Sequence, residues 1–212
     1  MAERVQCTHD PVSIAGEVLD PYRHICAFVD SRAEMQRLFD PFLLEGLEVG
    51  DRLSFVVGPQ DRAVWVRHFR QAGFDMPALL EQRRFEVRTW LEERPGNARF
   101  DKDAMLELLE EALGSPPEPR VRLVSEMGWA AADDNRDLLE FEARANYLMP
   151  DHPHIAVCVY DTAQFGGDVM IDILRTHPMA LIGGVLQINP FYVPPDEFLA
   201  ELRSRETPGS NA

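Results

Sequence analysis

The sequence predicts one α/β domain with a mainly parallel sheet and helices on both of its faces. Two segments, residues 24–30 and 154–161, are short apolar runs that each begin at a histidine, contain one cysteine and end at an aspartate. Runs of this length are typical of strands that are buried on both faces of a parallel sheet. Segments with helical periodicity separate the apolar runs, and this alternation favours right-handed strand–helix–strand crossovers. The 212 residues suffice for one large domain of this class and are few for two.

The predicted elements follow the order strand, turn, helix along most of the chain. After the first strand, Ser31 is placed to cap a helix over residues 34–47, in which Pro41 predicts a kink or a restart. A second strand over 53–57 enters a glycine-containing turn that leads to a helix. Further strands are predicted at 85–90, 120–124, 155–160 and 179–188, the last interrupted at Gly183 and Gly184, and further helices at 102–113, 136–148, 169–175 and 195–205. Residues 1–20 are predicted to be an N-terminal extension, 21–206 the domain and 207–212 a flexible tail.

Composition and charge restrict the classes of function. The chain has 36 acidic and 21 basic side chains, a formal net charge of -15, which repels nucleic-acid phosphates and anionic lipids. We therefore expect no direct nucleic-acid partner and no membrane partner. The apolar runs are too short to cross a bilayer, the N-terminus lacks the apolar stretch of a signal peptide, and Cys7, Cys26 and Cys158 show no CxxC spacing. These observations predict a cytoplasmic protein.

The turn after the second strand has the outline of a phosphate-binding loop, because it lies between a strand and the N-terminus of a helix. Its residues are Gly58, Pro59, Gln60, Asp61 and Arg62. A functional loop of this kind needs several glycines, a lysine for the terminal phosphates and a Ser or Thr for magnesium. Pro59 has no amide proton, and Asp61 would repel phosphate. The turn therefore predicts a degenerate phosphate loop and argues against ordinary ATP hydrolysis.

Three carboxylates stand where predicted strands end. Asp30 and Asp161 close the two similar apolar runs, and Glu126 follows the strand at 120–124. The carboxyl ends of parallel strands meet at one edge of a sheet, and ligands of open α/β sheets bind in the crevice beyond that edge. We therefore expect the three carboxylates to converge on a ligand site, the alternative being that each one simply begins a loop.

Two pairs of chemically reactive side chains are expected to share a strand face. His24 and Cys26 are two residues apart, as are Cys158 and Tyr160. If the two strands are neighbours, these groups would form a soft-metal or reactive-thiol cluster. A buried free cysteine acting as a small apolar residue is the favoured interpretation, so no metal is predicted.

Aromatic and polar residues in the second half of the chain suit a pocket for a small organic molecule. Glu142 and Asn146 lie one helical turn apart, and His177 precedes a strand. The segment 189–195 contains three prolines beside aromatic residues and predicts a lid, a pocket wall or a partner-docking strip. Core packing is the alternative for each aromatic side chain. The complete predicted ligand-binding set is His24, Cys26, Asp30, Glu126, Trp129, Glu142, Asn146, Cys158, Tyr160, Asp161, His177, Asn189 and Tyr192.

Six motifs together resemble the MEDS family, the methanogen/methylotroph sensory domain: residues 24–30, 126–129, 141–146, 158–161, 175–178 and 189–195. The resemblance runs in order from about 24 to 199. It implies a three-layer RecA-like sheet, similar to that of circadian-clock ATPases, with a degenerate phosphate loop. It also implies a sensory role that involves small hydrocarbon-type ligands. Such domains often accompany a helix-turn-helix, a histidine kinase or an anti-sigma module, and this chain has no room for one. We therefore expect a stand-alone domain that binds a ligand or a separate partner protein.

The leading hypothesis is a stand-alone, cytoplasmic and non-catalytic sensory domain that binds a small molecule at the carboxyl edge of the sheet. It would relay binding to a protein partner in a signalling or transcription-control system. A homo-oligomer is compatible with this hypothesis. No cofactor is named by the residues. The alternatives are a divergent nucleotide-binding protein with weak or no ATPase activity, using Glu126 as base and Asp161 for magnesium, and an interaction module without a ligand.

Overall fold

The computed structural model describes residues 11–19, 23–58, 61–89, 100–114, 119–132, 135–151 and 153–205. Its main sheet has seven strands in the order β5-β4-β6-β7-β3-β8-β9. Neighbouring strands are parallel from β5 to β8, and β9 alone pairs antiparallel, with β8. The strands are β3 (His24–Val29), β4 (Arg52–Val57), β5 (Phe85–Thr89), β6 (Val121–Glu126), β7 (Ile155–Asp161), β8 (Met179–Ile182) and β9 (Val185–Ile188).

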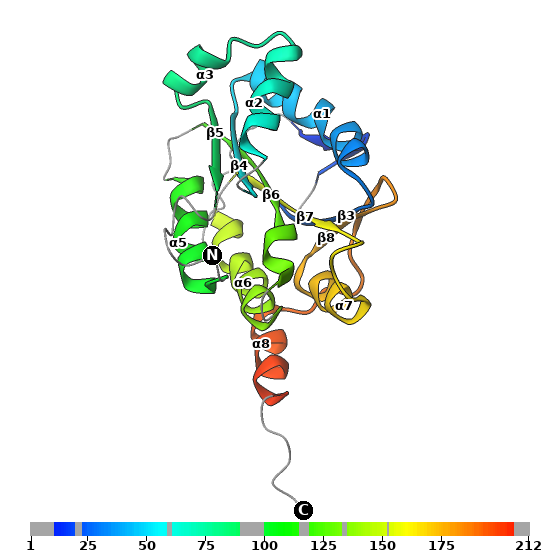
Figure 1. Cartoon of the computed structure of the whole chain (residues 1–212). Coiled ribbons are helices and arrows are strands. Elements are labelled where there is room, and N and C mark those ends of the chain that lie inside the picture. Colours follow the sequence, from blue (N-terminus) through cyan, green and yellow to red (C-terminus); the bar gives the residue numbers. More distant parts are fainter. Residues whose placement is uncertain are drawn as a thin grey trace, which may run out of the picture.

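Helices cover both faces of this sheet (Figure 1). One face carries α1 (Arg32–Val49), α2 (Arg62–Gln71) and α3 (Met76–Glu81). The other carries α5 (Lys102–Leu113), α6 (Asn135–Leu148), α7 (Gly167–Thr176) and α8 (Pro195–Ser204), with the short 3-10 helices η1 (Met127–Ala132) and η2 (Met149–Asp151). The predicted fold class, a three-layer and mainly parallel α/β sheet, is confirmed.

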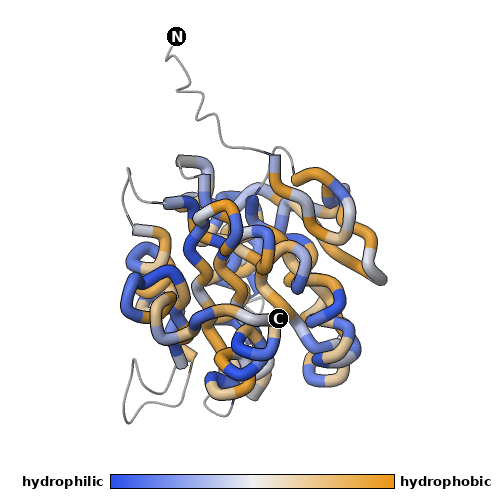
Figure 2. The backbone as a smooth tube through the Cα atoms, turned by 90° about the horizontal axis from the view of Figure 1, so that it is seen from above, coloured by the Kyte–Doolittle hydropathy of each residue, from blue (hydrophilic) through white to orange (hydrophobic). Residues whose placement is uncertain are grey.

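The two halves of the core follow from the alternation of side chains along each strand. On β3, Ile25 and Ala27 face the α1 side, whereas Cys26 between them faces the α6 side. Both faces of the central strands are therefore apolar, and Figure 2 shows hydrophobic strands at the centre of the molecule, surrounded by helices with hydrophilic segments. This double burial explains why the strands read as continuous apolar runs.

Helix α1 shows how the local sequence determines an element. The Ser31 side chain accepts a hydrogen bond from the amide of Glu34, and Gly50 ends the helix at a φ of 92°. Pro41 lies inside the helix, which continues through it. The predicted restart at Pro41 is therefore wrong, because the seven buried residues of this helix hold both halves against the sheet.

The segment predicted as one interrupted strand at 179–188 is instead a hairpin of β8 and β9. Gly183 and Gly184 have φ values of 58° and 81°. Positive φ at both central residues is the geometry of the tight turns that join antiparallel strands. The chain reverses there, which places β9 at the edge of the sheet.

One helix and one hairpin of two strands were absent from the predicted set. Helix α3 begins at the cap Asp75, whose side chain accepts a hydrogen bond from the amide of Ala78. Strands β1 (Ser13–Ile14) and β2 (Glu17–Val18) form a small antiparallel hairpin. Ile14 and Leu19 from this region are buried in the core on the α1 side. Part of the segment assigned to an N-terminal extension thus packs against the domain.

A buried group of charges lies at the amino end of β6. The Nε of Arg122, which is 1% exposed, donates to Oδ2 of Asp51 at 2.7 Å, and the Nε of Arg120 donates to the same oxygen at 3.0 Å. A Cβ on Gly46 of α1 would lie 2.7 Å from the Cδ of Arg122. Gly46 therefore provides the space through which this arginine reaches Asp51.

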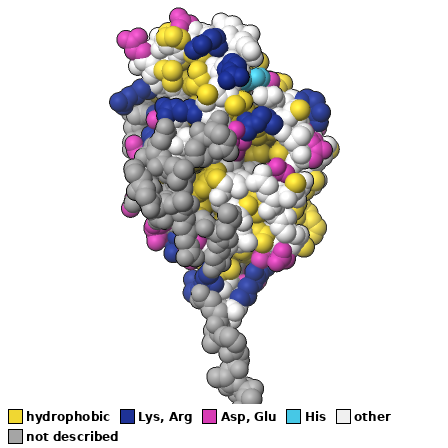
Figure 3. Space-filling view, in the orientation of Figure 1, with side chains coloured by type: hydrophobic (Ala, Val, Ile, Leu, Met, Phe, Trp, Pro, Cys, Tyr) yellow, Lys and Arg dark blue, Asp and Glu magenta, His cyan; other side chains and the backbone are white. Residues whose placement is uncertain are grey.

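The surface carries charges of both signs. Figure 3 shows Lys and Arg side chains gathered over the upper part of one face, in the region of α2 and α3, with acidic side chains scattered among and below them. Among the described residues, no helix is long and apolar enough to span a membrane.

Candidate functional site

A crevice with a volume of about 410 Å³ opens at the carboxyl ends of β3, β4, β6 and β7. Its polar lining comes from Ser31, Arg32, Asp61, Glu126, Asp161 and Gln164. Its apolar lining includes Val29, Met35, Trp129 and Val159. A crevice at this edge is the usual ligand position in an open α/β sheet.

Arg32 links two carboxylates across the crevice. Its guanidinium forms an ion pair with Asp61 and lies 3.5 Å from Oε2 of Glu126. The indole of Trp65 donates a hydrogen bond of 2.6 Å to Oε1 of Glu126. Burial raises the pKa of Glu126 above its ordinary value, and Trp65 and Arg32 offset only part of this effect. The carboxylate at the end of β6 is therefore held in place and is costly to ionise.

Asp161 organises the loop that follows β7. Its Oδ1 accepts a hydrogen bond of 2.9 Å from the amide of Ala163, and its Oδ2 accepts one of 2.9 Å from Nε2 of Gln164. A Cβ on Gly128 would come within 2.5 Å of Oε1 of Gln164. The glycine after β6 thus lets this amide side chain lie over the crevice.

The predicted degenerate phosphate loop borders the same crevice. Gly58 and Asp61 line it, and Arg62 is the exposed first residue of α2. Pro59 and Gln60 lie outside the described residues. A second strand-to-helix connection, at Asp30 and Ser31 between β3 and α1, also reaches this edge. From the sequence, Asp30 was predicted to be a ligand residue, whereas Ser31 was predicted only as a helix cap.

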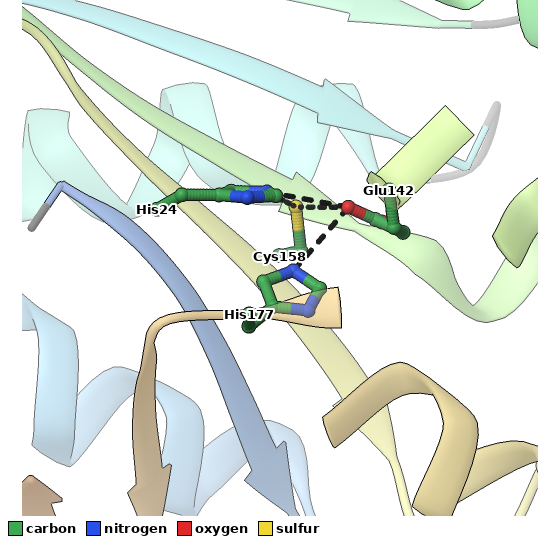
Figure 4. Close-up of side chains that lie close together, drawn as sticks. All are labelled: His24, Glu142, Cys158 and His177. Carbon is green, nitrogen blue, oxygen red and sulfur yellow. Dashed lines mark hydrogen bonds and ion pairs between the residues drawn. The ribbon is translucent and has the colours of Figure 1, made fainter. Parts of the chain in front are cut away.

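A separate cluster lies on the α6 side of the sheet. His24 from the start of β3, Glu142 from α6, Cys158 from β7 and His177 from the connection before β8 turn their side chains toward one another (Figure 4). All four are at most 4% exposed. Oε2 of Glu142 lies 3.3 Å from Nε2 of His24, 3.3 Å from Nε2 of His177 and 3.5 Å from Sγ of Cys158.

Further polar groups surround this cluster. The hydroxyl of Tyr160 donates to Oε1 of Glu142. Nδ1 of His24 lies 3.0 Å from Oδ1 of Asn146. The thiol of Cys26, on the adjacent strand, donates instead to the carbonyl of Met179 at 3.7 Å.

Burial governs the protonation of this cluster. It raises the pKa of the Cys158 thiol well above its ordinary value, and the Glu142 carboxylate raises it further. It also lowers the pKa of His177, as does the nearby His24. Burial alone would raise the pKa of Glu142, but the two imidazoles more than offset this, so that its pKa lies below the ordinary value. The cluster therefore consists of a buried carboxylate, a thiol that keeps its proton, and two imidazole rings.

The structure separates residues that were expected to lie at one edge of the sheet. Glu126, Trp129 and Asp161 line the crevice, and Asp30 stands at its rim with an exposed side chain. The expectation that the other polar residues also gather there is wrong. His24 opens β3 and so lies at its amino end, and α6 delivers its polar side chains to the sheet face rather than to the edge. The residues displaced in this way are His24, Cys26, Glu142, Asn146, Cys158, Tyr160 and His177.

Two of the predicted ligand residues have other roles among the described residues. The Nδ2 of Asn189 donates to the carbonyls of Leu174 and His177, and its Oδ1 accepts from the amide of Phe191. Asn189 therefore fastens the loop after β9. Tyr192 is half-buried in that loop and does not line the described crevice.

Sequence reasoning missed Arg32, Trp65 and Gln164. Arg32 directly follows the Asp30-Ser31 cap, so its position after a strand was the available signal. Trp65 and Gln164 are assigned by tertiary contacts alone, because nothing in their local sequence distinguishes them from packing residues.

Comparison with solved structures shows which fold this chain shares. The flagellar accessory protein FlaH from Methanocaldococcus jannaschii is 15% identical, with a TM-score of 0.50, and the match covers 78% of this chain and 76% of that one. The uncharacterized protein PH0321 from Pyrococcus horikoshii, solved with an unknown peptide, is 9% identical with a TM-score of 0.58, covering 79% and 82%. Both have RecA-like folds, and this chain shares that fold.

Sequence comparison then gives the family. Residues 23–178 match the MEDS family, described as the methanogen/methylotroph, DcmR sensory domain, and the chain belongs to this family. A curated relative, the transcriptional repressor DcmR from Methylorubrum extorquens (strain DSM 6343 / CIP 106787 / DM4), is 27% identical over 170 residues. The match covers 77% of this chain and only 61% of the relative. Together these similarities support a sensory or regulatory role.

Proposed function

We propose that this chain is a non-catalytic sensory domain that binds a small organic molecule in the crevice at the carboxyl edge of its sheet. The observation that carries the proposal is the meeting of side chains from three parallel strands, β3, β6 and β7, and from the connections after β3, β4, β6 and β7, around a volume of about 410 Å³. Pockets of a few hundred cubic ångströms with a small number of placed polar groups are typical of small-molecule sites.

The lining suggests the chemistry of the ligand. Asp61, Glu126 and Asp161 are acidic side chains, and Arg32 is the single basic side chain among the described lining residues. An excess of carboxylates favours a neutral or cationic molecule that donates hydrogen bonds, and it disfavours a triphosphate. Met35 and Trp129 offer apolar contact for a small hydrocarbon part.

The ion pairs of Arg32 provide a path for relay to a partner. Arg32 is the first residue of α1, Asp61 precedes α2, and Glu126 ends β6. A ligand that donates to Asp61 and Glu126 competes with Arg32 for these carboxylates. Binding would then alter how the starts of α1 and α2 are held, which a partner regulator can read as a shift between two arrangements.

The experiment is a thermal-shift and calorimetric titration of the purified chain with amines, alcohols, halogenated methanes and nucleotides. A ligand present at 100 times its Kd is expected to stabilise the protein by about 2.7 kcal/mol. Glu126→Gln and Asp161→Asn are expected to weaken binding of the same compound. Glu81→Gln, which changes an exposed carboxylate at the end of α3, is the matched control and should bind as the wild type does.

Two outcomes would contradict the proposal. One is a complete absence of binding across the panel. The other is binding that survives both crevice substitutions, which would place the ligand elsewhere.

A second candidate function is that of a divergent nucleotide-binding protein, and the titration with nucleotides, together with a phosphate-release assay, tests it. It is favoured by the placement of Glu126 and Asp161 at the ends of the neighbouring strands β6 and β7. Phosphate release from ATP that is abolished by Asp161→Asn would support this candidate. Background release by both proteins, with no shift by ATP, would remove it.

A further inference from the structure

The buried cluster under α6 presents four ligand atoms of the kinds that transition metals prefer. They are Nε2 of two histidines, one thiol sulfur and one carboxylate oxygen, and all lie within 4.8 Å of one another. These side chains come from four places in the chain, namely β3, α6, β7 and the connection between α7 and β8. The crevice proposed above uses none of them.

The hydrogen bonds around His24 determine which of its ring nitrogens faces the cluster. Nδ2 of Asn146 lies 2.8 to 3.2 Å from three carbonyl oxygens, those of Glu142, Ala143 and Thr176, so its two protons are shared among acceptors. The amide oxygen of Asn146 must then face His24 and accept from its Nδ1. In the neutral ring, Nε2 of His24 is therefore without a proton and points at the Glu142 carboxylate.

His177 has the same arrangement. Its Nδ1 lies 2.8 Å from the carbonyl oxygen of Ile173, which can only accept, and 3.0 Å from the hydroxyl of Thr176, which itself donates to that carbonyl, so Nδ1 carries the proton. Its Nε2 is buried and has no hydrogen-bond partner among the residues that the structure describes, although it lies 3.3 Å from Oε2 of Glu142. When both rings are neutral, two unprotonated ring nitrogens and a carboxylate oxygen face one another, and these lone pairs repel unless a proton on one ring or a metal cation lies between them.

We propose that His24, Glu142, Cys158 and His177 bind one divalent transition-metal ion, and that zinc is the best match. A tetrahedral zinc ion with bonds of about 2.0–2.3 Å holds its ligand atoms about 3.3–3.7 Å apart. Four of the six separations fall in that range, namely 3.3 Å from Oε2 to each Nε2, 3.5 Å from Oε2 to Sγ and 3.7 Å from Sγ to Nε2 of His24, and the other two are at most 4.8 Å. Two imidazoles, a thiolate and a carboxylate form a borderline-soft donor set.

The charges and protons balance. The ion brings two positive charges, the Glu142 carboxylate and the Cys158 thiolate bring two negative charges, and the imidazoles are neutral. One proton leaves the thiol for solvent when the ion binds. The outer hydrogen bonds from the two Nδ1 atoms to an amide oxygen and a carbonyl, and from Tyr160 to the carboxylate, are those expected around metal ligands.

All four coordination positions come from the protein, so the site is closed and resembles a structural zinc site rather than a hydrolytic one. The ion would tie α6 to β3, β7 and β8. Because β7 also carries Asp161, the metal would hold the strand that shapes one wall of the crevice.

The test measures metal directly in the full chain. We expect about one zinc ion per chain by elemental analysis after purification and after reconstitution of chelator-treated protein. Cobalt substitution should give tetrahedral d–d bands and a thiolate-to-cobalt charge-transfer band. Cys158→Ser should lose the charge-transfer band, and Cys26→Ser, a matched change of a buried cysteine on the adjacent strand, should keep it.

Asn146→Ala tests the outer hydrogen bond without touching a ligand, and it should weaken zinc binding by about 10–100-fold. The wild-type readout does not depend on the folding of any variant. Less than about a tenth of an equivalent of zinc after reconstitution, with no cobalt spectrum, would overturn the proposal. So would a folded Cys158→Ser protein whose cobalt spectrum equals that of the wild type.

Discussion

Cys158 and Asp161 lie three residues apart on β7, yet they belong to two separate sites. Cys158 faces Glu142 beneath α6, whereas Asp161 ends the strand and lines the crevice. The strand therefore connects a buried polar cluster to the open edge of the sheet. A change in either site can act on the other through the position of this one strand, because strands within a packed sheet move as rigid elements.

Removal of the Tyr160 hydroxyl should destabilise the protein. Tyr160 is fully buried and donates to Oε1 of Glu142, so Tyr160→Phe leaves a buried carboxylate oxygen without its donor. We expect a loss of about 1–3 kcal/mol in the free energy of unfolding, measured by urea denaturation. Tyr147→Phe, at a residue that is 49% exposed, should change it by less than about 0.5 kcal/mol. Equal effects of the two substitutions would contradict this account.

Asp51→Asn should be strongly destabilising. Asp51 accepts from both Arg120 and Arg122, and its neutralisation leaves positive charge buried at the amino end of β6. Breaking a buried pair in this way costs about 3–5 kcal/mol. Glu45→Gln removes the other carboxylate near Arg122, but Glu45 is 46% exposed, so its loss should cost less than about 1 kcal/mol. Chemical denaturation of the two variants, side by side with wild type, checks the difference.

Gly46→Ala and Gly167→Ala should have opposite effects. The new Cβ at position 46 would lie 2.7 Å from Cδ and Nε of Arg122, which is held by its ion pair with Asp51. The clash is expected to cost about 1–3 kcal/mol and to exceed the helix propensity that alanine adds. A Cβ at Gly167, in the first turn of α7, meets no atom within 4 Å, so this variant should be neutral or more stable by up to about 1 kcal/mol. Thermal denaturation distinguishes the two, and a stable Gly46→Ala protein would show that Arg122 can move.

Glu126 should make stability depend on pH. Its pKa is raised above the ordinary value of 4.5 in the folded protein, mainly by burial, so the folded state holds a proton that the unfolded state releases. The stability that this proton contributes is fully present below pH 4.5, the pKa of the unfolded state, and it is lost as the pH rises through the pKa of the folded state. Arg32, Asp61 and Trp65 are the groups that face this carboxylate.

Glu126→Gln removes this titration while keeping an acceptor for the Trp65 indole. The stability of the variant relative to wild type should therefore increase between pH 4 and pH 7, as measured by denaturation at each pH. A constant difference across that range would exclude the raised pKa as the cause.

Much of the fold could be predicted because its signals are local. The apolar runs at β3 and β7, the Ser31 cap and the amphipathic period of α5 each lie within one short segment. The hairpin of β8 and β9 was missed as a reversal, although Gly183 and Gly184 were recognised as an interruption, because two glycines are compatible with both a bulge and a turn. Burial of Ile14 in the first hairpin, by contrast, depends on packing of β1 against α1.

The sequence by itself determined the α/β class, the succession of strands and helices and the family, and it identified the polar residues of the buried cluster and the acidic residues of the crevice. Only the tertiary structure decided that these residues form two groups. Glu142 meets His24 and His177 because α6 lies across β3 and β7, and Asn146 reaches His24 over a separation of 122 residues. Side-chain periodicity is a property of a single element, whereas the meeting of side chains depends on strand order and helix placement, which the packing of the whole chain sets.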